Sequence, residues 1–162
     1  MSTTITVGIA DLHVVKPPDV LVTYALGSCV GICLLDPIAH VGGLAHIMLP
    51  DSSLISESHL QPLKFADTGI AELVRLMEVQ GARRIRMRAK IAGGAQMFAA
   101  MSNSAIANIG NRNIVAVKNV LNQLRIPITV EDVGKDYGRT LYFYPEDGRM
   151  VIKSGTKGEW VW

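Results

Sequence analysis

Short apolar runs that end at glycine or proline follow one another through the first fifty residues. Three of these runs span residues 20–26, 30–35 and 44–49, and Gly27, Pro37 and Pro50 stand close to their ends. Runs of four to eight apolar residues bounded by turn residues are typical of buried strands. The first third of the chain therefore predicts several consecutive strands.

The hydrophobic period changes after residue 60. Apolar residues then recur at spacings of three and four, which predicts an amphipathic helix over residues 62–80, with Gly81 as its left-handed cap. A second helix is predicted over 111–124. Strands are predicted over 85–91, where every second residue is basic, and over 126–133, and a hairpin over 141–153. For residues 154–162 the sequence predicts no secondary structure.

Strands outnumber helices in this interpretation, and the early strands are consecutive. Such an order favours an α+β fold, with two main helices on a strand-rich mixed sheet, over a doubly wound parallel sheet. The chain of 162 residues has the length of one domain and shows no repeat or linker, so we expect a single domain over 1–162.

The composition excludes several classes of protein. Hydrophobic residues make up 49% and charged residues 19%, which is incompatible with intrinsic disorder. The net charge of +2 argues against nucleic acid or an anionic membrane as a partner. The apolar stretch over 20–35, which has no charged residue, is too short for a membrane-spanning helix, and no signal peptide is visible. We therefore expect a cytoplasmic protein whose two cysteines form no disulfide.

Cys29 and His46 are the candidate catalytic residues. Cys29 follows Gly27 and Ser28 between two predicted strands, where a tight turn can expose the thiol and nearby amides can hold an oxyanion. Free cysteines are more often small core residues, and both interpretations of Cys29 stay open; for Cys33, inside an apolar run, we expect the core. His46 is a suitable base if its strand lies beside that of Cys29.

Three other chemistries have weaker support. Zinc would need Cys29, Cys33, His40 and His46, but their spacing fits no common zinc motif, so no metal site is predicted. The Gly93-Gly94 pair lacks the remaining residues of a phosphate-binding loop. The basic residues of 84–90 are not interleaved with the aromatic side chains that stack on bases.

Several motifs in a fixed order resemble one known family. They are Thr23-Tyr-Ala-Leu-Gly-Ser-Cys29-Val, Gly42-Gly-Leu-Ala-His46-Ile-Met-Leu-Pro50, Lys64-Phe-Ala-Asp67, Ala89-Lys-Ile-Ala-Gly-Gly-Ala95 with Met97-Phe98, Ile109-Gly-Asn-Arg-Asn113, Asp132-Val-Gly134 and Gly138-Arg139. Together they are similar to CheD, the chemoreceptor glutamine deamidases of bacterial and archaeal chemotaxis, and the resemblance runs from about residue 5 to about residue 153. One departure is Lys135, where the resemblance leads us to expect a second glycine.

The resemblance implies a fold, a mechanism and partners. The fold would be a layered α/β sandwich related to the deamidating domains of cytotoxic necrotizing factor toxins. Cys29 would be the nucleophile, His46 its base and Thr23 the group that orients His46, with Gly27 and Ser28 in the oxyanion and substrate loop. No metal or organic cofactor is implied. The partners would be the cytoplasmic helical region of chemoreceptors and a CheC-type phosphatase, and the alternative function is a non-catalytic regulatory module that binds both.

Overall fold

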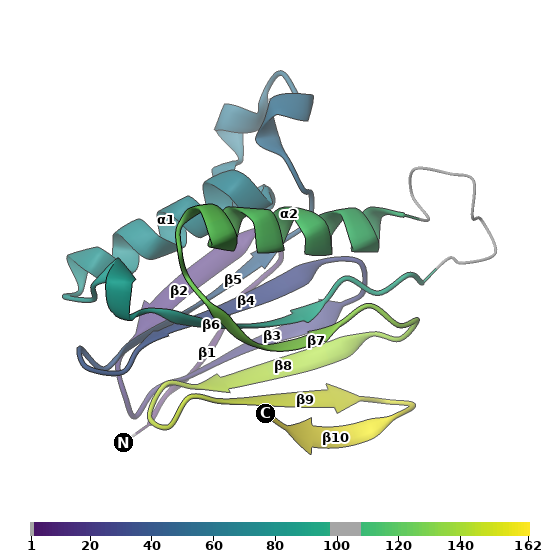
Figure 1. Cartoon of the computed structure of the whole chain (residues 1–162). Helices are drawn as coiled ribbons and strands as arrows, with labels where there is room; N and C mark the ends of the chain where they lie inside the picture. Colours follow the sequence, from purple (N-terminus) through teal and green to yellow (C-terminus); the bar gives the residue numbers. More distant parts are fainter. Residues whose placement is uncertain (1, 98–107) are drawn as a thin grey trace.

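Ten strands and two α-helices make up the residues that the computed structural model describes, 2–97 and 108–162 (Figure 1). The helices are Ala66–Val79 (α1) and Ile109–Gln123 (α2). The strands are Thr4–Thr6 (β1), Asp11–Val15 (β2), Val20–Leu26 (β3), Val30–Asp36 (β4), Val41–Ile47 (β5), Arg88–Gly93 (β6), Ile128–Val133 (β7), Arg139–Tyr144 (β8), Arg149–Ser154 (β9) and Gly158–Val161 (β10). Phe98, part of one motif quoted above, lies outside the described residues.

The strands divide between two five-stranded sheets. The first sheet has the order β1-β3-β8-β9-β10 and the second has the order β2-β5-β4-β6-β7. Each sheet contains one parallel pair, β1 with β3 and β6 with β7, and its other pairs are antiparallel. The predicted α+β class with two main helices and mixed strand pairing is therefore confirmed, with the strands in two sheets.

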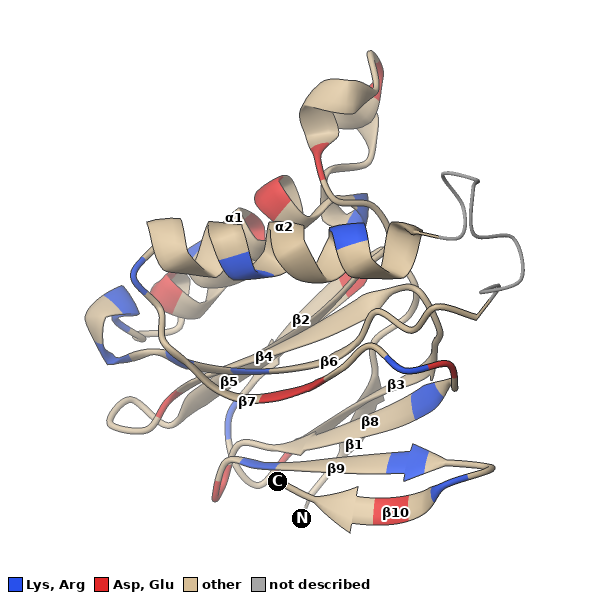
Figure 2. Ribbon diagram, turned by 45° about the vertical axis from the view of Figure 1, so that its right-hand side comes forward, with Lys and Arg blue, Asp and Glu red and all other residues tan. Residues whose placement is uncertain are grey.

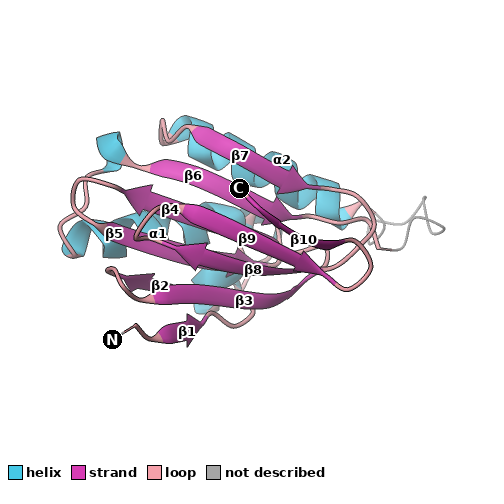
Figure 3. Ribbon diagram, turned by 90° about the horizontal axis from the view of Figure 1, so that it is seen from below, coloured by secondary structure: helices cyan, strands magenta, loops and turns pink. Residues whose placement is uncertain are grey.

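The molecule has three layers, in which the second sheet is the middle one. Both α-helices cover one face of this sheet, and the first sheet lies against its other face (Figures 1 and 3). Every residue of β5 is buried, and β4 is buried except at Leu35. A strand covered on both faces needs apolar residues on both, which explains why the runs 30–35 and 44–49 do not alternate.

Alternate residues of β4 face the two neighbouring layers. Val30, Ile32 and Leu34 belong to the cluster that packs under the helices. Cys29 and Cys33 belong to the cluster between the two sheets, which also holds Leu141 of β8. Cys33 is only 1% exposed, so the expected core position of this residue is confirmed.

Both predicted helices exist, with shifted boundaries. Pro62–Lys64 form a separate 3-10 turn, and α1 begins only at Ala66 because Phe65 has an extended backbone. Gly81 follows α1 with φ of +101°, as predicted for a left-handed cap. Neither helix is long and apolar enough to cross a membrane, among the ranges 2–97 and 108–162.

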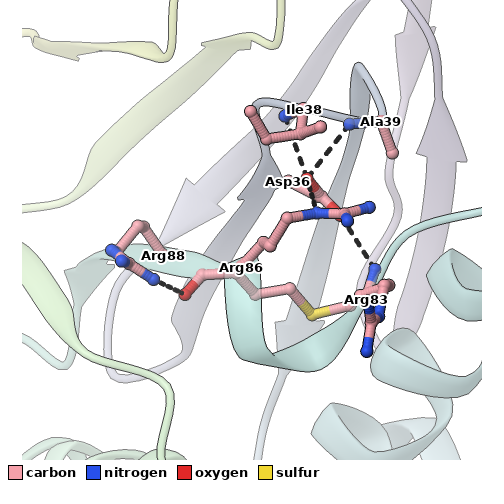
Figure 4. Close-up of polar contacts among 7 residues, drawn as sticks. Asp36, Ile38, Ala39, Arg83, Arg86 and Arg88 are labelled. Atoms are coloured by element: carbon pink, nitrogen blue, oxygen red, sulfur yellow. Dashed lines mark hydrogen bonds and ion pairs between the residues drawn. The ribbon is translucent and has the colours of Figure 1, made fainter.

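The predicted basic strand over 85–91 is wrong in its first half. Arg84–Arg86 form a 3-10 turn, and the strand begins at Arg88. The cause is the buried Asp36 at the end of β4, which accepts hydrogen bonds from Arg86 Nε at 3.0 Å and from the Arg83 amide at 2.8 Å (Figure 4). Burial alone would raise the pKa of Asp36, but the hydrogen bonds, that of Arg86 first, lower it to about 2. The ionised carboxylate thus holds a basic turn (Figure 2) where alternation predicted a strand.

The C-terminal segment, whose structure the sequence did not predict, joins the edges of the two sheets. It forms β10 against β9, and the indole nitrogens of Trp160 and Trp162 both donate hydrogen bonds to Oδ2 of Asp132 on β7, the latter at 2.8 Å. The other oxygen of Asp132 accepts a 3.0 Å hydrogen bond from Nε of Arg139, which is buried. This ion pair therefore fastens the first sheet to the second.

Candidate active site

Cys29 lies in the turn that carries the chain from the first sheet to the second. The strand before it, β3, contains a bulge between Thr23 and Leu26, and Ala25 in this bulge has a φ of +61°. Bulges re-aim the chain and are frequent beside functional sites. The thiol of Cys29 is half-buried, so it remains partly open to solvent.

The neighbouring β6–α2 connection holds this turn through backbone hydrogen bonds. The carbonyl of Gly27 accepts from the amide of Ala95, and the carbonyl of Cys29 accepts from the amide of Gly94, both at 2.8 Å. Gly93 has a φ of +111°, and a side chain there would overlap the Cys29 carbonyl oxygen. The Gly93-Gly94 pair is therefore needed for close packing against the cysteine turn.

His46 lies on β5 and faces the same space between the sheets as Cys29. It pairs with Gly31 of β4, and cross-strand partners project to the same face of a sheet. Cys29 is two residues before Gly31, so Cys29 and His46 are diagonal neighbours, typically about 7–8 Å apart between backbones and within reach of long side chains. Gly31 has no side chain that could stand between them. The structure therefore brings the predicted nucleophile and base to one face of adjacent strands.

Thr23 connects His46 to the first sheet. Its hydroxyl Oγ1 lies 2.7 Å from Nδ1 of His46 and donates a hydrogen bond to the Val7 carbonyl at 2.7 Å. A hydroxyl has one hydrogen to donate, and the Val7 carbonyl can only accept it. Nδ1 of His46 must therefore carry the proton and donate it to Thr23, which assigns the lone pair to Nε2.

The free lone pair of His46 is available for a proton. Nε2 is buried and has no hydrogen-bond partner among the residues that the structure describes, Cys29 included. In enzymes without substrate, the hydrogen bond between base and nucleophile is often long and tightens only when substrate binds. The ring thus has the correct tautomer to accept a proton from a thiol at Nε2.

Burial keeps both groups of the pair neutral. It lowers the pKa of His46 to about 4, and the nearby Asp11 carboxylate opposes this shift only in part. Burial also raises the pKa of Cys29, although the backbone amide of Cys29 itself lowers it to a smaller extent. Near pH 7 the resting pair is therefore a thiol and a neutral imidazole, so the thiolate forms by proton transfer to His46 during the reaction.

The four residues considered for zinc do not converge. His40 precedes β5 and His46 stands six residues further along the strand, a separation of about 20 Å at about 3.3 Å per residue. Cys33 is buried between the sheets, and burial raises its thiol pKa.

Asn113 is a buried polar residue to which the sequence analysis assigned no role. It lies on α2, and its Nδ2 donates hydrogen bonds of 2.9 Å to the Ser28 carbonyl and of 2.9 Å to the Met48 carbonyl. It shares the buried face of the helix with Gly110, Val117 and Leu121. A polar residue in the apolar period of a helix is the signal that could have singled it out.

Comparisons with known proteins place this arrangement in a family. A family model described as CheD chemotactic sensory transduction matches residues 48–154. A relative from Caldanaerobacter subterraneus subsp. tengcongensis, named probable chemoreceptor glutamine deamidase CheD, is 56% identical over 148 residues, which are 91% of each chain. The chain belongs to the CheD family.

Two further CheD proteins extend the similarity over almost the whole chain. One from Lachnoclostridium phytofermentans, named probable chemoreceptor glutamine deamidase CheD, is 54% identical over 154 residues, 95% of each chain. One from Halalkalibacterium halodurans, named chemoreceptor glutamine deamidase CheD, is 48% identical over 159 residues, 98% of each chain. The family model begins after Cys29 and His46, so the nearly full-length CheD relatives are the matches that span the candidate active site.

Lys135, a departure from the expected CheD pattern, has the backbone conformation of a glycine position. Lys135 has a φ of +65°, a left-handed conformation that glycine adopts most easily. Its carbonyl accepts a 2.8 Å hydrogen bond from the Gln96 amide. In this CheD chain a lysine therefore keeps the conformation for which a glycine was expected.

Proposed function

We propose that this protein is a chemoreceptor glutamine deamidase, with Cys29 as nucleophile, His46 as general base and Thr23 as the residue that orients His46. The observation that carries the proposal is the hydrogen-bond chain from His46 through Thr23 to the Val7 carbonyl, which leaves Nε2 as the free proton acceptor on the face of Cys29. The names of the CheD relatives supply the substrate class.

The first half of the reaction forms a thioester. His46 Nε2 takes the thiol proton as Sγ of Cys29 attacks the carboxamide carbon of a receptor glutamine. The carbonyl oxygen becomes an oxyanion in the turn of Gly27 and Ser28, where backbone amides can stabilise it. The C–N bond then breaks, and the imidazolium of His46 returns the proton to the leaving nitrogen, so ammonia departs.

The second half releases glutamate. A water molecule gives a proton to His46 and attacks the thioester carbon, and the second tetrahedral intermediate expels the thiolate, which is reprotonated. Thr23 carries no charge and therefore stabilises the imidazolium less than a carboxylate would, so its contribution is orientation. All of these steps use only protein groups and water.

The proposed partners follow from the same assignment. The substrate is the helical cytoplasmic region of a chemoreceptor, which places the protein in the cytoplasm. A CheC-type phosphatase is the second partner that we propose, and this rests on the family resemblance alone. The net charge of +2 gives no reason to add nucleic acid or a membrane surface.

The test is ammonia release from a chemoreceptor cytoplasmic fragment, with mass spectrometry of the fragment. Each converted glutamine gains about 1 Da, because carboxamide hydrolysis replaces NH₂ by OH. Cys29→Ala and His46→Ala should each lower the rate by about a thousandfold or more, and the two losses should not add in the double variant.

Cys33→Ala is the matched control, because it removes the other thiol from the core without touching the proposed pair. It should keep most of the activity. A mass shift that persists in Cys29→Ala would refute the assignment of the nucleophile, and a wild-type protein that binds the fragment without any mass shift would favour the regulatory module.

A further inference from the structure

Asn113 ties together the two segments that carry the proposed nucleophile and base. Its side chain is fully buried, and its Nδ2 lies 2.9 Å both from the carbonyl oxygen of Ser28, the residue before Cys29, and from that of Met48, two residues after His46. Two acceptors on one side fix the amide orientation, because only the NH₂ group can donate to both. One side chain from α2 therefore bridges the cysteine turn and the segment that follows β5.

The bond to Ser28 also orients the peptide that follows it. In a planar trans peptide, the carbonyl of one residue and the amide of the next point in opposite directions. Since the Ser28 carbonyl is held toward α2, the Cys29 N–H must point away from α2. The Gly27 carbonyl, bonded to Ala95, fixes the Ser28 N–H by the same rule.

These two amides can serve an acceptor outside the turn. Among the described residues, neither the Ser28 N–H nor the Cys29 N–H donates to a backbone carbonyl in this turn. The amide nitrogen and the sulfur of Cys29 belong to one residue and are separated by three bonds, so the N–H lies close to the thiol. An N–H beside the nucleophilic sulfur is also beside the oxygen of any tetrahedral intermediate bonded to that sulfur.

We propose that Asn113 is a positioning residue for deamidation, which holds the Ser28–Cys29 peptide so that the Cys29 N–H faces the developing oxyanion. The inference rests on the proposed function and deepens it. Asn113 is 0% exposed and does not touch the substrate, so it acts entirely through the Ser28 carbonyl. Its second hydrogen bond, to the Met48 carbonyl, fixes the orientation of the Asn113 amide.

The experiment separates this role from helix anchoring. Asn113→Ala removes both hydrogen bonds, and Asn113→Ser keeps one donor on a shorter side chain. Val117→Ala is the matched control, because Val117 is equally buried one turn further along α2 and belongs to the core cluster under the helices. Thermal unfolding establishes that each variant is folded before kcat and KM are measured on the receptor fragment.

Two rates are compared in each folded variant: ammonia release, which passes through an oxyanion, and alkylation of Cys29 by iodoacetamide, which does not. Asn113→Ala should lower kcat by about a hundredfold, the usual loss when an oxyanion donor is removed, with KM changed by less than about threefold. Its alkylation rate should stay within about threefold of wild type, because the thiol and His46 remain in place. The kcat of Asn113→Ser should lie between those of Asn113→Ala and wild type. Val117→Ala should keep the wild-type rates of ammonia release and of alkylation.

Each contrary result has a distinct meaning. Wild-type kcat in Asn113→Ala would overturn the inference and leave the proposed function intact. A parallel loss of alkylation and ammonia release in Asn113→Ala would show that Asn113 acts on the thiol instead. Failure of both Asn113 variants to fold would show that Asn113 serves stability alone. Either result overturns the inference. A wild-type protein that releases no ammonia would overturn the proposed function and the inference with it.

Discussion

Replacing Thr23 by valine tests the hydrogen-bond chain at the centre of the site. Valine has the shape of threonine but a methyl group in place of the hydroxyl, so the packing is preserved. The change leaves two buried polar groups without a partner, the Val7 carbonyl and the Nδ1–H of His46. Each unsatisfied buried group costs about 1–3 kcal/mol, so Thr23→Val should lower the free energy of unfolding by about 2–6 kcal/mol.

The same substitution should reduce catalysis beyond its effect on stability. Without Thr23 as acceptor, the proton of His46 is no longer held on Nδ1, and the ring can present an N–H instead of a lone pair to Cys29. We expect ammonia release to fall by about ten- to a hundredfold, less than the loss expected when the general base itself is removed. Thr23→Ser keeps the hydroxyl and should retain most of the activity.

Urea denaturation followed by the fluorescence of Trp160 and Trp162 measures the stability of all three proteins. Nitrogen-15 NMR of the imidazole ring reports the tautomer of His46 directly, and wild type should carry the proton on Nδ1. The reasoning is refuted if Thr23→Val is as stable as wild type, if Thr23→Ser behaves like Thr23→Val, or if the wild-type proton resides on Nε2.

Three further predictions concern other parts of the site and its support. The pKa of His46 is about 4 in the folded protein against an ordinary 6.5, so the unfolded chain binds the proton at a higher pH than the folded protein does. The free energy of unfolding should therefore fall by about 3 kcal/mol as the pH is lowered from 6.5 to 4. Urea denaturation measures this loss, which should be absent in His46→Gln. Gly93→Ala should cut ammonia release at least tenfold, because its side chain would displace the Cys29 carbonyl; activity equal to wild type in a folded variant contradicts this. Asp132→Asn leaves the buried guanidinium of Arg139 without its counter-charge and should destabilise the fold by about 3–5 kcal/mol in urea titrations, and a shift below 1 kcal/mol would show that this ion pair is dispensable.

The sequence suggested the residues of the candidate site but not their interactions. Motifs around Cys29 and His46 identified both residues and their neighbouring strands, because glycine-flanked segments and strand order are local properties. The tautomer of His46 could not be predicted, since it depends on the Val7 carbonyl, a backbone group that every residue carries. The position of the proton on His46 could therefore be assigned only from the tertiary structure.

Long-range contacts account for the remaining misses. The hydrogen bond from Asn113 to the Ser28 carbonyl joins residues 85 positions apart in the sequence, and no local pattern predicts such a bond. The alternating arginines near residue 86 predicted a strand, but Asp36, 50 positions earlier than Arg86, holds part of them in a turn. In both cases a buried polar group far along the chain decides what the local pattern leaves open.

The division of the site between the two sheets has a consequence for how the protein folds. Thr23 stands in β3 of the first sheet and His46 in β5 of the second, so the proton on the imidazole is placed only after the two sheets have docked. A refolding intermediate with one sheet formed would bury apolar surface and show strand signals in circular dichroism, yet would not hold this histidine in its working form. Recovery of enzyme activity should therefore lag behind recovery of secondary structure, and the delay between the two signals would time the closure of the sandwich.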